Sequence, residues 1–160
     1  MTGETAPPKE DELREPLARL VQSSGAITAL LITKEGIALA EAGETSYFNT
    51  AAMAALVAGM FSATREVARM VGEQQFSILL QQGENRHIHI SLVTDVVMLV
   101  VIFEDYLRIG RVRLEARKSS HGLAHVLASG ADSARARGEI SEGAFKEGAI
   151  TLINRIFCTE

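Results

Sequence analysis

The sequence predicts a single domain of mixed α and β structure (class α/β, in its α+β form), in which helices cover a central antiparallel sheet. Three patterns carry this prediction: a β-hairpin over residues 26–42, one long helix over residues 51–73 and two neighbouring strands over residues 87–103. The chain has 160 residues, 47% of them hydrophobic, which suffices for one compact core and argues against two domains.

The N-terminal part consists of a polar segment and a short helix. Residues 1–9 contain two prolines and small polar side chains that offer nothing to bury, so we expect this segment to be disordered. Apolar residues at helical spacing follow and predict an amphipathic helix that ends at Gly25. We expect this helix to open a domain that spans residues 10–128.

Four apolar segments predict most of the sheet. Residues 26–33 and 37–42 read as a tight hairpin, with Gly36 in the left-handed conformation at its turn. Residues 87–93 alternate between polar and apolar side chains, as in a strand with one face on a core. Residues 96–103 are apolar on both faces, which predicts a central strand that is covered on both sides.

The long helix has well-marked ends and two different faces. Asn49 is a favourable N-cap, and Gly72 supplies the C-terminal stop. One face carries larger apolar side chains, and we expect it to pack on the sheet: Met53, Val57, Met60, Thr64, Val67 and Val71. The opposite face carries small side chains followed by two charged ones: Ala52, Ala55, Gly59, Ser62, Glu66 and Arg69.

The small residues on this second face indicate a protein interface. A solvated helix face normally carries long polar side chains, and Gly59 costs about 1 kcal/mol of helix stability relative to alanine in an exposed helix interior. Small side chains permit the close approach of another backbone. The alternatives are a second layer of the same domain, or an alanine-rich helix that tolerates exposure.

Three further segments complete the chain. Residues 76–86 fit either a short strand or an irregular loop, and both remain open. A helical pattern begins near residue 109, and the small polar residues of 129–140 predict a linker after it. Residues 141–160 form an amphipathic segment that we expect to dock on another surface, with its apolar positions at Phe145, Leu152, Ile153 and Ile156.

Composition excludes several classes of function. A net charge of -4 and an isoelectric point near 5.6 give no whole-chain basis for binding nucleic acid or an anionic membrane. The first residues do not form a signal peptide, and no apolar run reaches the roughly 20 residues that span a bilayer. The single cysteine, Cys158, has no disulfide partner. We expect a cytoplasmic protein that does not insert into membranes.

The sequence carries no catalytic motif. It lacks the phosphate-binding GxxxxGK[ST] loop and the GxSxG, CxxC and HExxH motifs, so we predict no enzyme, no cofactor and no metal site. His87 and His89 share a strand face without an evident third ligand, and we interpret them as edge-strand or interface residues. A basic group is interpreted as a solvated face balanced by carboxylates, in preference to a surface for an acidic partner: Arg108, Arg111, Arg113, Arg117 and Lys118.

The order of the elements resembles the Roadblock/dynein light chain family. GAITALLITKEGIALAEAGE is similar to that family's opening hairpin, and AALVAGMFSATREVARMVGEQQF to its central helix. VVMLVVIFEDYLRIGRVRL is similar to its central strand and the start of its last helix, so the resemblance covers roughly residues 17–129. Within the family, the chain most resembles the bacterial MglB type, which regulates Ras-like small GTPases of the MglA type.

The resemblance implies a profilin- or longin-like fold, with about five strands, one long helix on one face and two helices on the other. It implies a homodimer that continues the sheet across its two-fold axis, with residues 87–93 as the edge strand. The dimer interface would contain His87, His89, Ser91, Ala52 and Ala58. The GTPase would bind across the paired central helices, at Ala55, Gly59, Ser62, Glu66 and Arg69.

Two functions stay open under this resemblance. An activator would order the switch loops of the GTPase and accelerate GTP hydrolysis without an arginine finger, in the control of cell polarity or gliding motility. A scaffold would bind a GTPase or another roadblock protein without changing any rate. Residues 141–160 would contact the GTPase a second time or pack on the neighbouring protomer, and recruitment to the cell poles is left open.

Overall fold

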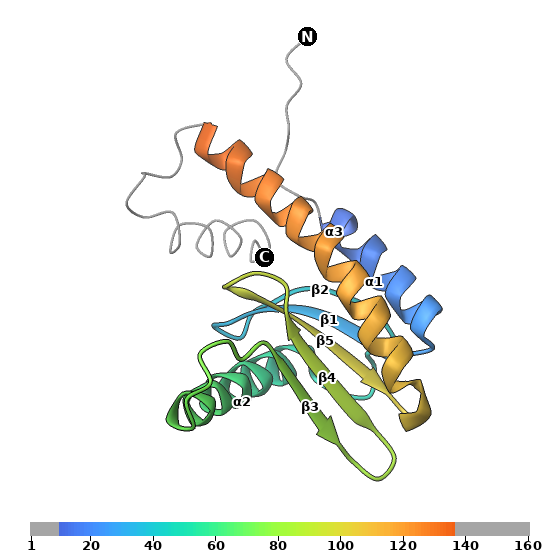
Figure 1. Cartoon of the computed structure of the whole chain (residues 1–160). Coiled ribbons are helices and arrows are strands. Elements are labelled where there is room, and N and C mark those ends of the chain that lie inside the picture. Colours follow the sequence, from blue (N-terminus) through green and yellow to red (C-terminus); the bar gives the residue numbers. More distant parts are fainter. Residues whose placement is uncertain (1–9, 137–160) are drawn as a thin grey trace.

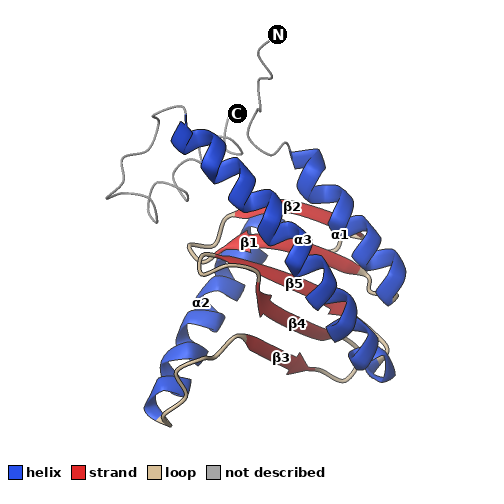
Figure 2. Cartoon of the chain, turned by 45° about the horizontal axis from the view of Figure 1, so that its top comes forward, coloured by secondary structure: helices blue, strands red, loops and turns tan. Residues whose placement is uncertain are grey.

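The computed structural model describes residues 10–136, which form three layers around one antiparallel sheet (Figure 1). Helix α2 (Thr50–Met70) covers one face of the sheet, whereas α1 (Glu10–Ser24) and α3 (Ile109–Ala136) cover the other (Figure 2). The sheet has the order β2-β1-β5-β4-β3, with β1 at Thr28–Thr33, β2 at Ala38–Gly43, β3 at Ile78–Gln82, β4 at His87–Leu92 and β5 at Val97–Phe103. A 3₁₀ turn, η1 (Tyr106–Arg108), leads into α3. This arrangement confirms the predicted fold class.

Strand β5 lies at the centre of the sheet because it is apolar along its whole length. All 7 of its residues are buried. It pairs with β1 on one side and with β4 on the other, and Val100 lies opposite both Leu30 and Ile90. Successive side chains enter the two cores in turn, so neither face of the strand meets water. The prediction of a central strand over residues 96–103 is confirmed.

The two cores lie on opposite faces of the sheet. The larger core joins the sheet to α1 and α3, and its fully buried side chains include Leu13, Leu17, Leu20, Leu31, Leu99, Val101, Phe103, Val112, Ala116 and Leu123. The smaller core joins the sheet to α2 and contains Leu30, Ile32, Ala54, Val57, Ala58, Phe61, Ile90, Met98 and Val100. Successive side chains along each inner strand therefore pack alternately against the two helical layers.

Helix α2 is capped at the residues that the sequence predicts, although it ends at Met70 and not at residue 73. The side-chain oxygen of Asn49 accepts a hydrogen bond from the Ala52 N–H at 2.9 Å, which satisfies one of the free donors of the first turn. At the other end Gly72 has a φ of +89°, and the Glu73 N–H donates to the Ala68 carbonyl oxygen at 2.9 Å. This is a Schellman-type end, which favours glycine at the left-handed position.

The face of α2 that meets the sheet differs from the predicted stripe. Val57 is buried and Met53 and Met60 are partly buried, as expected, but Val67 is 60% exposed and Val71 is 79% exposed. No residue of α2 beyond Phe61 is buried, and the last turns of the helix extend past the strands (Figure 2). Helical periodicity identifies a face of a helix, but it does not say how far the sheet continues beneath it.

Strand β3 is the edge strand, so the prediction that residues 87–93 form the edge is wrong. The segment left open between strand and loop forms β3, which pairs with β4 alone, from Ile78 opposite Ser91 to Gln82 opposite His87. The first three residues of β3 are apolar and suit a strand, which allows this short segment to pair with the edge of β4.

Helix α3 continues through Ala136, so residues 129–136 are helical and the linker expected over 129–140 does not begin at 129. Three alanines favour the helix there, and extending an existing helix avoids the cost of nucleation. The predicted end of the domain at residue 128 thus falls inside a helix. Among residues 10–136, no helix combines the length and apolar character needed to cross a bilayer.

Candidate protein interface

The predicted partner-binding residues lie together on the exposed side of α2. Ala55, Gly59, Ser62, Glu66 and Arg69 are all exposed, as is Ala52 one turn earlier. The Glu66 carboxylate and the Arg69 guanidinium form an ion pair with each other, and both side chains are more than half exposed. The face therefore offers small side chains along its first half and a self-paired charge couple along its second.

Gly59 is not required by packing within the chain. A Cβ placed on Gly59 would have no heavy atom within 4 Å. An alanine there would stabilise the helix by about 1 kcal/mol. A glycine in open space in the middle of a helix thus remains unexplained by the fold of one chain, which is consistent with a surface that another molecule approaches.

The outermost face of α2 carries apolar side chains that the sequence analysis missed or assigned to the core. At about 100° per residue, Leu56, Ala63, Val67 and Met70 lie opposite the face that meets the sheet. Leu56 is 73% exposed, Val67 60% and Met70 86%. We call these four residues the outer apolar stripe. Side chains of this kind gathered on one exposed face are typical of protein interfaces.

The unpaired edge of β3 lies on the same side of the molecule as the end of α2 (Figures 1 and 2). Phe76, just before β3, packs on Phe61 of α2 with ring centroids 5.1 Å apart. Ile78 at the start of the strand is 47% exposed, with its side chain on the α3 face of the sheet. An open strand edge beside an apolar helix face can bind a second chain through both backbone and side chains.

Four residues predicted at the dimer interface are instead buried inside the chain. His87, His89 and Ser91 are 3%, 2% and 9% exposed, because β3 pairs with the edge of β4, Phe103 and Tyr106 pack on His87, and α3 lies beside His89 and Ser91. Ala58 is 5% exposed and packs on the sheet with Val57 and Phe61. These four assignments are wrong, whereas Ala52 is exposed as an interface requires.

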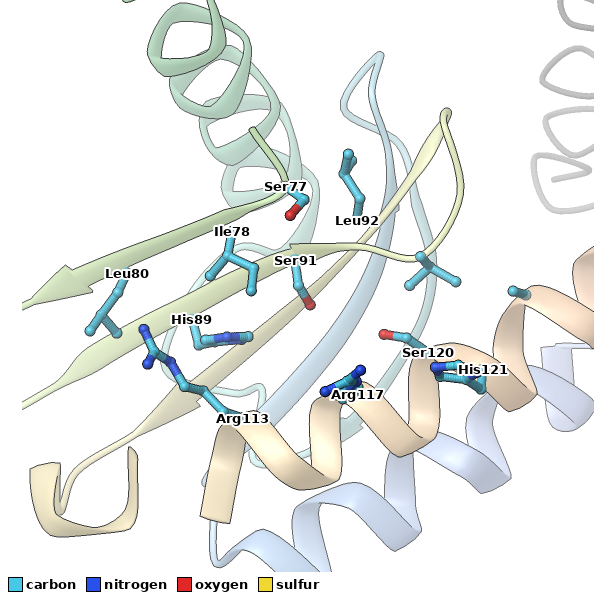
Figure 3. A pocket seen from close by; sticks show the side chains of 12 residues that line it. Ser77, Ile78, Leu80, His89, Ser91, Leu92, Arg113, Arg117, Ser120 and His121 are labelled. Carbon is cyan, nitrogen blue, oxygen red and sulfur yellow. The ribbon is translucent and has the colours of Figure 1, made fainter. Parts of the chain in front are cut away.

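The side chains of His89 and Ser91 enter a pocket of about 820 Å³ between β3, β4 and α3 (Figure 3). Arg113, Arg117 and His121 line it from α3, together with Ser120. Burial, and then the positive charge of Arg113, lower the pKa of His89 to about 4.

The basic group divides between two sides of α3 and its entry. Arg111 and Lys118 both lie within 4 Å of the Glu115 carboxylate, and Arg108 pairs with Asp105. These pairs fit the prediction of a face balanced by carboxylates. Arg113 and Arg117 have no carboxylate partner among the described residues, and they line the pocket instead. Arg113 and Arg117 are four residues apart, and this spacing in the sequence already places them together on one side of the helix.

The described part of the chain holds no group of three or more histidine, cysteine, aspartate or glutamate residues that could bind a metal ion. His87 instead packs between the rings of Phe103 and Tyr106, each with its centroid 5.2 Å away. The predicted docking residues Phe145, Leu152, Ile153 and Ile156 lie outside the described residues.

The sequence profile of the Roadblock/LC7 domain matches residues 13–103. The chain belongs to the Roadblock/LC7 family. The match runs from α1 to the end of β5, so it includes α2 and the β3 edge, whereas α3 and its side of the pocket lie beyond it. A comparison with curated protein sequences gave no match.

Solved structures similar to this Roadblock protein include MglB proteins from two bacteria. MglB from Myxococcus xanthus is 28% identical with a TM-score of 0.72, and the match covers 81% of this chain and 95% of that one. The gliding protein MglB from Thermus thermophilus is 30% identical with a TM-score of 0.64, covering 70% and 85%. Profilin II from Acanthamoeba castellanii, 14% identical with a TM-score of 0.51, covering 71% and 97%, shares the fold alone.

Proposed function

We propose that this Roadblock protein is a homodimeric regulator of a Ras-like small GTPase of the MglA type. The observation that carries the proposal is the exposed side of α2, where small and apolar residues face solvent in a domain similar to two MglB structures. The dimer accelerates GTP hydrolysis by ordering the switch loops of the GTPase. In the cell it acts in the control of polarity or gliding motility.

The proposed dimer uses the outer apolar stripe and the β3 edge. Pairing of two β3 strands would continue the sheet across a two-fold axis and remove both open edges. The same rotation would bring the two α2 helices together, so that Val67 and Met70 leave water. A related MglB structure has a tetrameric arrangement, which agrees with self-association in this group of proteins.

The proposed activation does not use an arginine finger. A transition-state arginine raises the hydrolysis rate of a small GTPase by about 10³ to 10⁵. Of the two arginines on α2, Arg69 is paired with Glu66, and Arg65 lies half-buried on the flank of the helix. We expect Arg65→Ala and Arg69→Ala to retain activation, since neither side chain would enter the active site of the GTPase.

The test is the GTP hydrolysis rate of the cognate MglA-type GTPase, to be identified from gene neighbourhood, with and without a stoichiometric excess of the protein. We expect an increase of at least about tenfold, well below that of an arginine finger. Ser62→Arg should abolish the increase and leave far-UV circular dichroism unchanged. Ala18→Arg, the same kind of change on the exposed face of α1, is the matched control. An unchanged rate with the unmodified protein would refute activation.

The second candidate function is a scaffold, which binds a GTPase or another Roadblock protein without altering hydrolysis. The small and apolar residues exposed on α2 support it, since they suit a docking surface and need not alter the active site of the GTPase. A stable complex with an unchanged hydrolysis rate would select this function.

Residues 141–160 are proposed as a second contact on the GTPase. Leu152→Asp with Ile156→Asp in the full chain should therefore weaken the complex, whether the protein is an activator or a scaffold.

A further inference from the structure

The floor of the pocket between α3 and β4 is built from buried polar groups that lack partners. The two ring nitrogens of His89 and the hydroxyl of Ser91 form no hydrogen bond within the described part of the chain. Both side chains point from β4 toward α3 (Figure 3). Proteins rarely leave buried donors and acceptors unpaired, because each lost hydrogen bond to water is a cost to folding. A polar molecule in the pocket would satisfy these groups.

The α3 side of the pocket is positively charged. Arg113 and Arg117 are four residues apart, so they lie on one face of the helix and reach toward β3 and β4 (Figure 3). None of the residues that line the pocket is acidic, and neither arginine has a carboxylate partner in the described part of the chain. Two guanidinium groups on one face suit a phosphate or carboxylate, which accepts paired hydrogen bonds from arginine.

Apart from Ser77, the remaining walls of the pocket are apolar. Ile78 and Leu80 come from β3, Leu92 is the last residue of β4, Val93 follows it, and Ala124 comes from α3. A pocket of about 820 Å³ lies within the usual size range of small-molecule sites. Apolar walls with a few convergent polar groups are also the usual composition of such sites. The pocket therefore has room for a ligand with an apolar body next to a charged group.

We propose that this pocket binds a small amphiphilic anion, whose phosphate or carboxylate meets Arg113 and Arg117 and whose apolar body lies against Leu80 and Val93. The hydroxyl of Ser91 and one ring nitrogen of His89 donate to the same anionic group. The pocket lies on the face of the sheet opposite α2, so its ligand does not compete with a partner on the exposed side of that helix.

The first experiment titrates the full-length protein with hexyl phosphate in a calorimeter. Inorganic phosphate serves as a probe without an apolar body, and hexanol as a probe without charge. We expect hexyl phosphate to bind at least about tenfold more tightly than either, because only this probe uses both halves of the pocket. Amide shifts in NMR spectra should be largest at His89, Ser91 and Ser120, which locates the bound probe independently of any substitution.

The second experiment compares two double variants with the same change in charge on the same helix. Arg113→Gln with Arg117→Gln should weaken hexyl phosphate binding by about tenfold or more. Arg111→Gln with Lys118→Gln, whose side chains pair with Glu115 outside the pocket, should leave binding unchanged. Equal affinity for hexanol or for inorganic phosphate, equal loss in both double variants, amide shifts elsewhere, or no binding at millimolar concentration would overturn the proposal.

Discussion

Gly36, in the turn between β1 and β2, lies directly against the backbone of α2 at Ala55. A Cβ placed on Gly36 would be 2.8 Å from the Cα of Ala55, a distance that real Cβ atoms essentially never show. The glycine also has a φ of +91°, and its N–H donates to the Thr33 carbonyl oxygen at 2.9 Å. The hairpin turn thus sets how closely α2 approaches the sheet at the beginning of its exposed stripe.

We predict that Gly36→Ala destabilises the protein by about 1–3 kcal/mol or more, since the substitution adds backbone strain and a contact with a rigid helix. The free energy of unfolding in urea measures this. Gly122→Ala is the matched control, because a Cβ on Gly122 of α3 meets nothing within 4 Å. The control should gain up to about 1 kcal/mol. Equal stability of the two variants would show that the turn can move away from α2.

The outer apolar stripe makes a prediction about self-association. Val67→Asp with Met70→Asp should convert the proposed dimer into a monomer, because two charges would have to be buried in an apolar contact. Sedimentation velocity measures the change in mass. The control is Leu107→Asp with Leu114→Asp, which alters apolar side chains that are 91% and 49% exposed near the start of α3. A control that dissociates while the first variant stays dimeric would place the interface elsewhere.

Gly59→Ala separates folding from association. In the monomeric Val67→Asp, Met70→Asp background, we expect it to raise the free energy of unfolding by about 1 kcal/mol, since its Cβ would enter open space. In the otherwise unmodified protein, the same methyl group should weaken the complex with the GTPase, because the proposed partner approaches α2 at this position. Binding that is unaffected by the substitution would mean that no partner lies close to Gly59.

Features set by a few neighbouring residues were predictable from the sequence. The cap at Asn49 and the left-handed glycines at 36 and 72 follow from the backbone conformation that each position requires. The edge of the sheet was not predictable in this way. Alternation in residues 87–93 shows that the strand has two faces, but whether β3 covers its edge depends on a pairing with a distant segment.

The candidate sites were predictable only in part, for related reasons. Val71 has the same helical phase as the partly buried Met53, and only the extent of the sheet beneath α2 decides that Val71 is exposed. Arg113 and Arg117 were separable from Arg111 and Lys118 by their spacing on the helix. That Arg113 and Arg117 line a pocket depends on the position of β3 and β4 beside α3, which the spacing does not give.

The buried imidazole of His89 predicts a specific loss of stability in acid. Its pKa is about 4 in the folded protein, against about 6.5 in an unfolded chain, so the unfolded state binds the extra proton between these values. The free energy of unfolding should therefore fall as the pH is lowered from 6.5 toward 4, by at most about 1.4 kcal/mol per pH unit from this site. Arg113 and Arg117 face the imidazole from α3, and no acidic residue lines the pocket to offset them.

The test is urea unfolding between pH 7 and pH 5. The free energy of unfolding should decrease less for His89→Gln than for the unmodified protein, whereas His125→Gln, at an exposed position of α3, should retain the full decrease. An unchanged decrease in His89→Gln would mean that water reaches the imidazole and that it becomes protonated without opening the fold.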